Sequence, residues 1–192
     1  SPYLEGEMQK ILPVVNRNGS DSAMLDNTLE FLTMSGMDLP LAVMILIPEP
    51  WANNSLMSQK KKDFYQYYAT MMEPWDGPAS ILFSDGDVMG AVLDRNGLRP
   101  SRYYITNDGF LILSSEVGVL EVPEEKIVLK ERLHPGKMLL VNTVQGKVLN
   151  DEEVKEYYAK KQPYGEWLDS YLVQLKDIKI PNLPVEEYTK EE

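Results

Sequence analysis

The sequence predicts an α+β fold in which helices pack on antiparallel strands. Three observations support this prediction. Apolar residues recur at helical spacing over residues 22–72, and short apolar runs separated by glycine-containing turns follow over residues 79–149. A last helical pattern begins at Asp151, after the predicted strands. No internal repeat is visible, so the chain is predicted to form one domain or a large part of one.

A polar loop over residues 16–22 precedes the first predicted helix, and Ser20 or Ser22 can cap that helix. Leucines at helical spacing predict the helix over residues 22–34, and Ser35-Gly36 is expected to end it. The helical part of the chain is therefore expected to start directly after this loop.

Two further helices are predicted before the strands begin. Residues 41–47 are apolar throughout, so their pattern fits a buried strand as well as a buried helix. Pro40 favours the helix, because proline fits the first helical turn. Residues 60–72 are predicted to form a helix with aromatic side chains on one face.

Three hairpins are predicted where short apolar runs flank a turn that contains glycine, because glycine accepts the positive φ of such turns. The paired segments are 79–83 with 88–93, 103–105 with 110–113, and 138–141 with 147–149. Asp151 is predicted to cap a helix that ends near residue 160. Residues 161–192, with prolines and scattered acids, are expected to form an exit linker.

Composition excludes several classes of function. The formal net charge of −11 repels phosphate backbones, so nucleic acid is not an expected partner. The chain has no cysteine, which excludes disulfides, cysteine-based metal sites and a thiol nucleophile within it. No apolar stretch reaches the roughly 18 residues of a membrane span. No signal-peptide core is visible at the start, and a cytoplasmic location is expected.

The residues alone identify no active site. Asp85 and Asp87 flank a glycine, but the rest of a calcium-loop pattern is absent, so a hairpin turn is expected. His134 lies in a loop without an acid or nucleophile in register, and no catalytic role is expected for it. The segment 94–100 is expected to be a structural corner in which Asp94 bridges Arg99.

Ser1 requires a separate argument, because some hydrolases use an N-terminal residue as nucleophile and its free amine as base. Pro2 and a polar, acidic segment follow Ser1, and no buried strand is present to hold it rigid. We therefore expect Ser1 to have no catalytic role.

Six stretches are too long and too specific to be turn or capping signals alone: Asn16-Arg17-Asn18-Gly19-Ser20-Asp21-Ser22-Ala23, Ile47-Pro48-Glu49-Pro50-Trp51, Glu73-Pro74-Trp75-Asp76-Gly77-Pro78, Leu93-Asp94-Arg95-Asn96-Gly97-Leu98-Arg99-Pro100, Ser115-Glu116-Val117-Gly118-Val119 and Arg132-Leu133-His134-Pro135-Gly136-Lys137-Met138. In this order they resemble the glutamate synthase large-subunit family. The resemblance covers roughly residues 11–160.

Details of the motifs place the chain within the wider amidotransferase group. The related purine-pathway phosphoribosyl transferase carries proline where this chain has Arg95. Two residues depart from the family pattern: Glu131 stands where glycine is expected, and His134 where glutamine is commoner. Both are interpreted as loop variation, so the resemblance is unchanged.

The resemblance implies a class II glutamine amidotransferase, an αββα sandwich of the N-terminal-nucleophile hydrolases. In that family a cysteine thiolate attacks the side-chain amide of glutamine, an Asn-Gly pair stabilises the oxyanion, and an arginine holds the substrate carboxylate. These residues are implied to lie upstream of Ser1, so this chain is expected to hold no catalytic residue. Asn18-Gly19 belongs to a different motif and is not the oxyanion pair.

Asp21 is the one functional residue that the resemblance carries over. In the family this aspartate accepts hydrogen bonds from the α-ammonium group of glutamine. A carboxylate beside a helix N-terminus is held ionised and oriented, which suits that role. The alternative is that Asp21 only caps the helix over residues 22–34; the motif favours substrate binding.

The resemblance also implies partners and cofactors outside this chain. The intact enzyme passes ammonia to 2-oxoglutarate at an FMN site, and an iron–sulfur cluster relays electrons from NADPH or ferredoxin. No cofactor or metal is expected in residues 1–192. Expected partners are glutamine, the rest of the large subunit and a small reductase subunit. Residues 1–160 are expected to be the later part of the amidotransferase domain, and residues 161–192 to lead to the next domain.

Taken alone, the chain is expected not to hydrolyse glutamine. It is also expected to self-associate, because strands without their partners would expose side chains such as Ile81, Phe83, Val88 and Leu93. Two alternatives remain: a different amidotransferase or an enzyme that uses Ser1, and a non-catalytic module that retains the fold.

Overall fold

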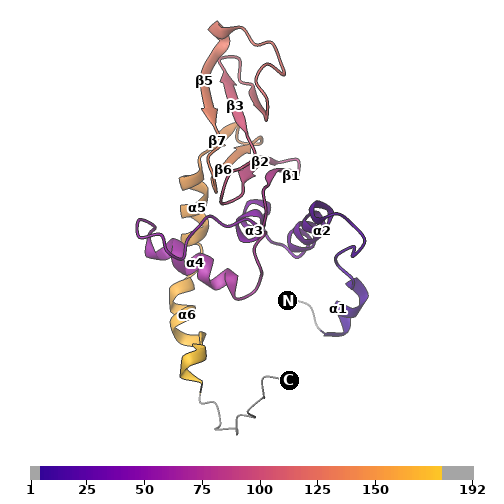
Figure 1. Ribbon diagram of the computed structural model, residues 1–192, viewed down its shortest axis with the longest axis vertical. Coiled ribbons are helices and arrows are strands. Elements are labelled where there is room, and N and C mark those ends of the chain that lie inside the picture. Colours follow the sequence, from indigo (N-terminus) through magenta and orange to yellow (C-terminus); the bar gives the residue numbers. More distant parts are fainter. Residues whose placement is uncertain (1–4, 179–192) are drawn as a thin grey trace, which may run out of the picture.

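The computed structural model describes residues 5–178 (Figure 1). The helices are α1 (Glu5–Ile11), α2 (Asp21–Met34), α3 (Leu39–Leu46), α4 (Gln59–Ala69), α5 (Asp151–Lys160) and α6 (Tyr164–Tyr171), with 3-10 turns η1 (Glu124–Lys126) and η2 (Leu175–Asp177). The strands are β1 (Ser80–Ser84), β2 (Val88–Leu93), β3 (Arg102–Thr106), β4 (Leu111–Ser114), β5 (Ile127–Arg132), β6 (Met138–Asn142) and β7 (Lys147–Leu149).

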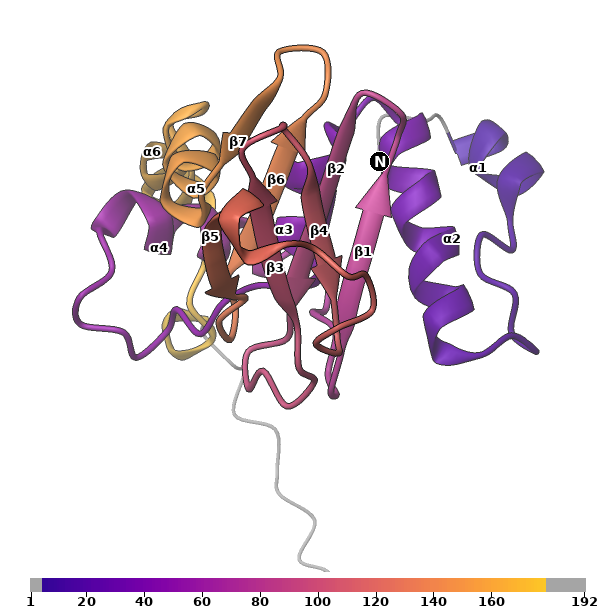
Figure 2. The ribbon, with the colours of Figure 1, turned by 90° about the horizontal axis from the view of Figure 1, so that it is seen from above.

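Helix α3 is the centre of the helical layer. Every one of its residues is buried, and Pro40 stands in its first turn, as the sequence predicts. Helix α2 packs on it through the periodic leucines, and it begins at the predicted loop with Ser20 as its N-cap. Figure 2 shows α5 and α6 on one flank of the sheets and α1 and α2 on the other.

An aromatic cluster joins α4 to α6. Phe64 is fully buried, and its ring lies edge-on to Tyr164, with centroids 5.4 Å apart. Tyr67 contacts both Tyr164 and Trp167. Such ring pairs add to the free energy that burial alone provides. The first part of the segment expected to be an exit linker is therefore a helix that packs into the core.

The strands form two antiparallel sheets. Sheet A has four strands in the order β1-β2-β6-β7, and sheet B has three in the order β4-β3-β5. All three predicted hairpins are confirmed: β1 pairs with β2, β3 with β4, and β6 with β7. Strand β5 was not predicted, and Glu131 lies in this strand rather than in a loop.

Alternation along the strands of sheet A gives it two apolar faces. One face packs on the helices through residues that include Phe83, Val92, Met138 and Leu140. The other face meets sheet B in a smaller cluster built around Ala91, Leu93, Leu133 and Leu139. Residues 5–178 thus form three layers: the helices, sheet A and sheet B. This arrangement confirms the predicted α+β class and agrees with the class II amidotransferase sandwich.

The expected list of exposed strand residues is wrong. Phe83 and Leu93 are buried, and Ile81 and Val88 are half-buried against the helices. The exposed apolar side chains of these strands are instead Leu82 and Met89, which point to the sheet B side. The helices cover Ile81, Phe83 and Val88, and the contact with sheet B covers Leu93.

Two details of the chain differ from the sequence interpretation. Helix α5 is capped by Asn150 rather than Asp151: the Asn150 side chain accepts from the Glu153 amide, and Glu153 reaches back to the Asn150 amide. Within the part of the chain that the structure describes, no helix combines the length and the apolar character that a membrane span requires.

Candidate functional site

The loop before α2 holds Asp21 at the first residue of that helix. Asn16 organises this loop: its amide donates to Asn27 Oδ1, and its own Oδ1 accepts from the Asn18 amide, both at 3.1 Å. The Gly19 amide donates to the Asn16 carbonyl at 3.0 Å. These bonds order the backbone of the loop immediately before Asp21, the first residue of α2.

Ser20, not Asp21, performs the capping. The Ser20 hydroxyl accepts from the Ala23 amide at 3.3 Å, and it lies 3.1 Å from the Ser22 hydroxyl. Asp21 is exposed, and no partner for its carboxylate is found among residues 5–178. The capping alternative for Asp21 therefore has no geometric basis, and an exposed carboxylate at a helix N-terminus is left available for a cation.

A buried ionic network lies where α5 packs beside the start of β6 and the α3–α4 loop. It was not predicted from the sequence. Lys155 is 3% exposed, and its ammonium contacts Asp151 at 2.6 Å and Glu49 at 3.1 Å. It also donates to the Gly136 carbonyl at 2.7 Å. Lys137 contacts the same two acids at 2.8 and 3.4 Å. The network joins the α3–α4 loop, the start of β6 and α5.

Electrostatics in this network follow from its burial and its charges. Burial by itself raises the pKa of Asp151, but Lys155, Lys137 and the Met138 amide overcome it, and the net shift is downward. Burial lowers the pKa of Lys137, and the two acids outweigh it and raise that pKa. Burial, with help from Glu49, raises the pKa of Tyr65, whose hydroxyl donates to Glu49 at 3.2 Å.

Asp151→Asn is expected to cost stability in a pH-dependent way. A carboxyl whose folded pKa lies below the unfolded value of about 3.9 contributes stability above that pH and loses it as pH falls through the folded pKa. The difference in unfolding free energy between the natural chain and Asp151→Asn should therefore be largest near neutral pH and shrink below about pH 4. Urea unfolding at several pH values measures it. Asp169→Asn, at an exposed acid of α6, is the control; a gap for Asp151→Asn that stays constant with pH would contradict the argument.

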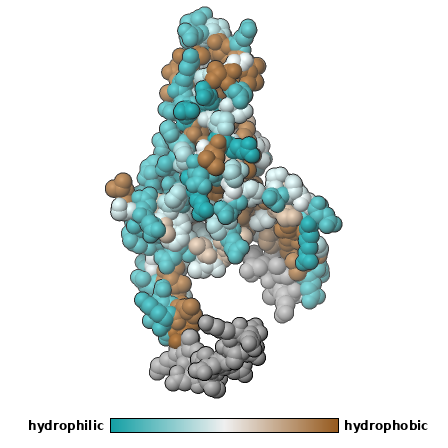
Figure 3. Space-filling model, viewed as in Figure 1, coloured by the Kyte–Doolittle hydropathy of each residue, from teal (hydrophilic) through white to brown (hydrophobic). Residues whose placement is uncertain are grey.

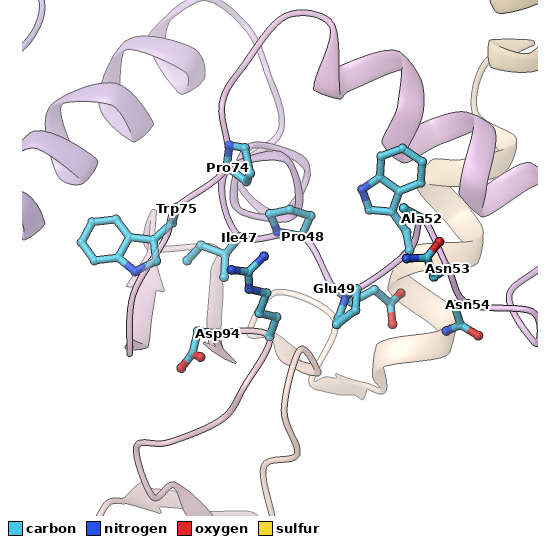
Figure 4. A pocket seen from close by; sticks show the side chains of 12 residues that line it. Ile47, Pro48, Glu49, Ala52, Asn53, Asn54, Pro74, Trp75 and Asp94 are labelled. Carbon is cyan, nitrogen blue, oxygen red and sulfur yellow. The ribbon is translucent and has the colours of Figure 1, made fainter. Parts of the chain in front are cut away.

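A pocket of about 510 Å³ opens beside Glu49. Figure 4 shows its lining running from Trp75 and Asp94 at one end to Asn53 and Asn54 at the other. Indole and proline rings make up part of its walls, beside polar and charged side chains. Arg95, the exposed cation of this lining, pairs with Asp76 at 3.0 Å. The lining includes two carboxylates: Glu49 pairs with Lys155 and Lys137, and Asp94 accepts from backbone amides.

The corner over residues 94–100 is structural, as expected, but its bonds differ from the prediction. Asp94 is buried and accepts from the amides of Ala79, Asn96 and Gly97 at 3.0, 2.9 and 3.2 Å. The expected bridge to Arg99 is not among the ion pairs of residues 5–178. Gly97 has a φ of +59°, and a Cβ there would lie 2.5 Å from Pro135, so the corner requires glycine.

The other residues singled out from the sequence show no site. Asp85 makes turn bonds to the amides of Asp87 and Val88, as the hairpin interpretation predicts. His134 is exposed, and its closest acid is Glu131 at 3.7 Å. Among residues 5–178, no group of three or more His, Cys, Asp or Glu side chains forms a metal-binding cluster. Ser1 lies outside the described residues.

Comparison with known proteins gives a consistent set of relatives. Residues 1–167 match the class-II glutamine amidotransferase family. The chain is 53% identical over 169 residues to the glutamate synthase [NADPH] large chain of Bacillus subtilis, covering 88% of this chain and 11% of that protein. It is 45% identical over 170 residues to the ferredoxin-dependent glutamate synthase 2 of Synechocystis, covering 88% and 11%. It is 42% identical over 195 residues to the glutamate synthase [NADH] of Saccharomyces cerevisiae, covering 100% and 9%. The chain thus spans about a tenth of the length of these relatives.

Proposed function

Because this chain belongs to the class-II glutamine amidotransferases, we propose that it forms part of the glutaminase domain of a glutamate synthase. The supporting observation is the match to glutamate synthases that use different electron donors, at 42–53% identity and over 88–100% of the chain. The domain would hydrolyse glutamine to glutamate and ammonia, and the ammonia would go to 2-oxoglutarate elsewhere in the long enzyme.

The nucleophile of this reaction would come from another part of the long enzyme, because the 192 residues contain no cysteine. Its thiolate attacks the amide carbon of glutamine and forms a glutamyl thioester as ammonia leaves, and water then releases glutamate. We assign FMN, the iron–sulfur cluster and the electron donor to other parts as well, since this chain offers no thiolate to ligate iron. Taken alone, the chain should release no ammonia from glutamine.

Asp21 would bind the α-ammonium group of glutamine. Three features support this role: the ordered loop before α2, the position at the first helical residue, and a carboxylate without a partner among the described residues. The carboxylate sits at the positive end of the helix dipole, which favours a negative charge at that position. It would position substrate and would take no part in bond breaking.

We further propose that residues 1–160 form the body of the domain and residues 161–192 lead away from it, with α6 as the part of this segment that still packs on the body. A cytoplasmic location, and assembly with the rest of the large chain and a small reductase subunit, remain predictions. The apolar groove between sheets A and B would be covered in the long enzyme by the remaining part of the same domain.

The test uses the full-length enzyme and the variant Asp21→Asn. Loss of one charge-assisted hydrogen bond, worth about 1.5–3 kcal/mol, should lower kcat/KM for glutamine by roughly ten- to a hundredfold. Activity driven by free ammonia should persist, because ammonia bypasses the glutaminase site. Glu30→Gln, at an exposed acid of the same helix, is the control. A parallel fall of both activities in Asp21→Asn would show that the residue is structural.

A further inference from the structure

Four apolar side chains are exposed in the short stretch that begins at the end of α6, residues 171–178, which we call the α6 extension. Tyr171 is 81% exposed, Val173 69%, Leu175 77% and Ile178 49%. Figure 3 shows brown surface at this lower end of α6. Single exposed apolar residues are ordinary, but a group of four within eight residues is typical of an interaction surface.

The backbone of the α6 extension is ordered by its own hydrogen bonds. The Leu172 amide donates to the Leu168 carbonyl at 2.9 Å, and the Asp177 amide donates to the Gln174 carbonyl at 2.9 Å. Helix η2 follows directly on α6 through this turn. The extension therefore presents its apolar side chains from a defined backbone, whereas Tyr164 and Trp167, in the first turns of α6, face the aromatic cluster.

The comparisons show which relatives share the α6 extension. The class-II amidotransferase match ends at residue 167, before the α6 extension. The alignment with the glutamate synthase of Saccharomyces cerevisiae covers all of this chain, which makes up 9% of that protein. The extension thus belongs to what the chain shares with glutamate synthases and lies beyond what it shares with the class-II family.

The size of the surface favours a tethered partner over a second copy. Four side chains bury on the order of a few hundred Å², well below the roughly 800 Å² per partner of a typical stable complex. A contact of that size suffices when the partner belongs to the same chain, because the tether provides a high effective concentration.

Building on the proposed function, we propose that the α6 extension docks on an apolar surface of the same glutamate synthase chain, outside the amidotransferase domain. Lys176 and Asp177 would form the polar rim of this contact. The contact would hold the end of the glutaminase domain against the part of the enzyme that follows.

The test measures hydrogen–deuterium exchange of residues 171–178 in the full-length protein that contains this chain. The triple variant Tyr171→Ser, Val173→Ser, Leu175→Ser should exchange at least about tenfold faster in this segment than the natural protein, because the apolar contact is lost. The variant Gln174→Ser changes the same segment without touching the apolar side chains or the polar rim and should leave its exchange unchanged. Peptides from α4 and α5 check that the triple variant remains folded.

Two results would overturn the proposal. In the first, the segment of the natural protein exchanges as fast as that of the triple variant, which means that nothing covers it. In the second, protection falls on dilution, which means that a second copy covers it. Exchange does not depend on activity, so an enzyme without glutaminase activity but with a protected segment would refute the proposed function and leave the docking intact.

Discussion

Replacing Lys155 by methionine is expected to lower the free energy of unfolding by about 3–5 kcal/mol. Methionine matches the length of the side chain but removes the buried ammonium, so that Glu49 and Asp151 keep only the half-exposed Lys137 as a cationic partner. The Gly136 carbonyl also loses its donor. Removing one partner of a buried ion pair costs more than the pair contributes, because the remaining buried charges lose most of their compensation.

Urea unfolding of Lys155→Met against the natural chain measures this effect. Lys60→Met, on the exposed first turn of α4, is the matched control and should stay within about 0.5 kcal/mol of the natural chain. Adding Glu49→Gln to Lys155→Met should recover part of the loss, since one buried negative charge is removed. Equal effects at positions 155 and 60 would show that the network contributes nothing to stability.

The isolated chain is expected to self-associate at micromolar concentration through the groove between its sheets. This groove has a volume of about 530 Å³ and an apolar lining that includes Leu82, Met89 and Phe110, which are 64, 54 and 63% exposed. Strand β1, an edge of sheet A, has a free side as far as residues 5–178 show. Exposed strand edges beside apolar surface recruit other chains.

Light scattering should therefore give a mass above that of one chain, and the double variant Leu82→Lys, Met89→Lys should return it to the monomer. Leu56→Lys serves as the control, because Leu56 is 95% exposed but lies in the α3–α4 loop, away from the groove. A natural chain that is monodisperse and monomeric at these concentrations would show that the groove needs no cover.

The parts of the fold that the sequence predicts are those that depend on local chemistry. The hairpins followed from glycine turns, and α2 from its cap and its leucine spacing, because both signals lie within a few residues. Strand β5 escaped prediction because its second half, Lys130-Glu131-Arg132, is charged and resembles a loop. Helix α6 escaped because it is short and begins beside Pro163 and Gly165, and because its stability depends on tertiary contacts such as those with α4.

The candidate site also has one part that local sequence signals predict and one part that they do not. Asp21 was assigned through a motif and stays a prediction; the loop before it follows the local capping signals, with Ser20 as the cap. The ionic network could not be found by such means, since Glu49, Lys137 and Lys155 meet only after the helices have packed on sheet A. The sequence offered two signals for this network: a glutamate between two prolines, and the spacing of one helical turn between Asp151 and Lys155. Both patterns are common on protein surfaces.

The pairing of Phe83 with Gly90 across β1 and β2 has a consequence for how this sequence can change. The Phe83 ring lies over the glycine, and a Cβ at position 90 would come within 2.1 Å of it. No rotation of a new side chain relieves that overlap, because the Cβ itself causes it. Positions 83 and 90 are therefore not independent: a side chain at 90 becomes possible only after the ring at 83 has been made smaller, and that order of substitution restricts the paths by which this sheet can be redesigned.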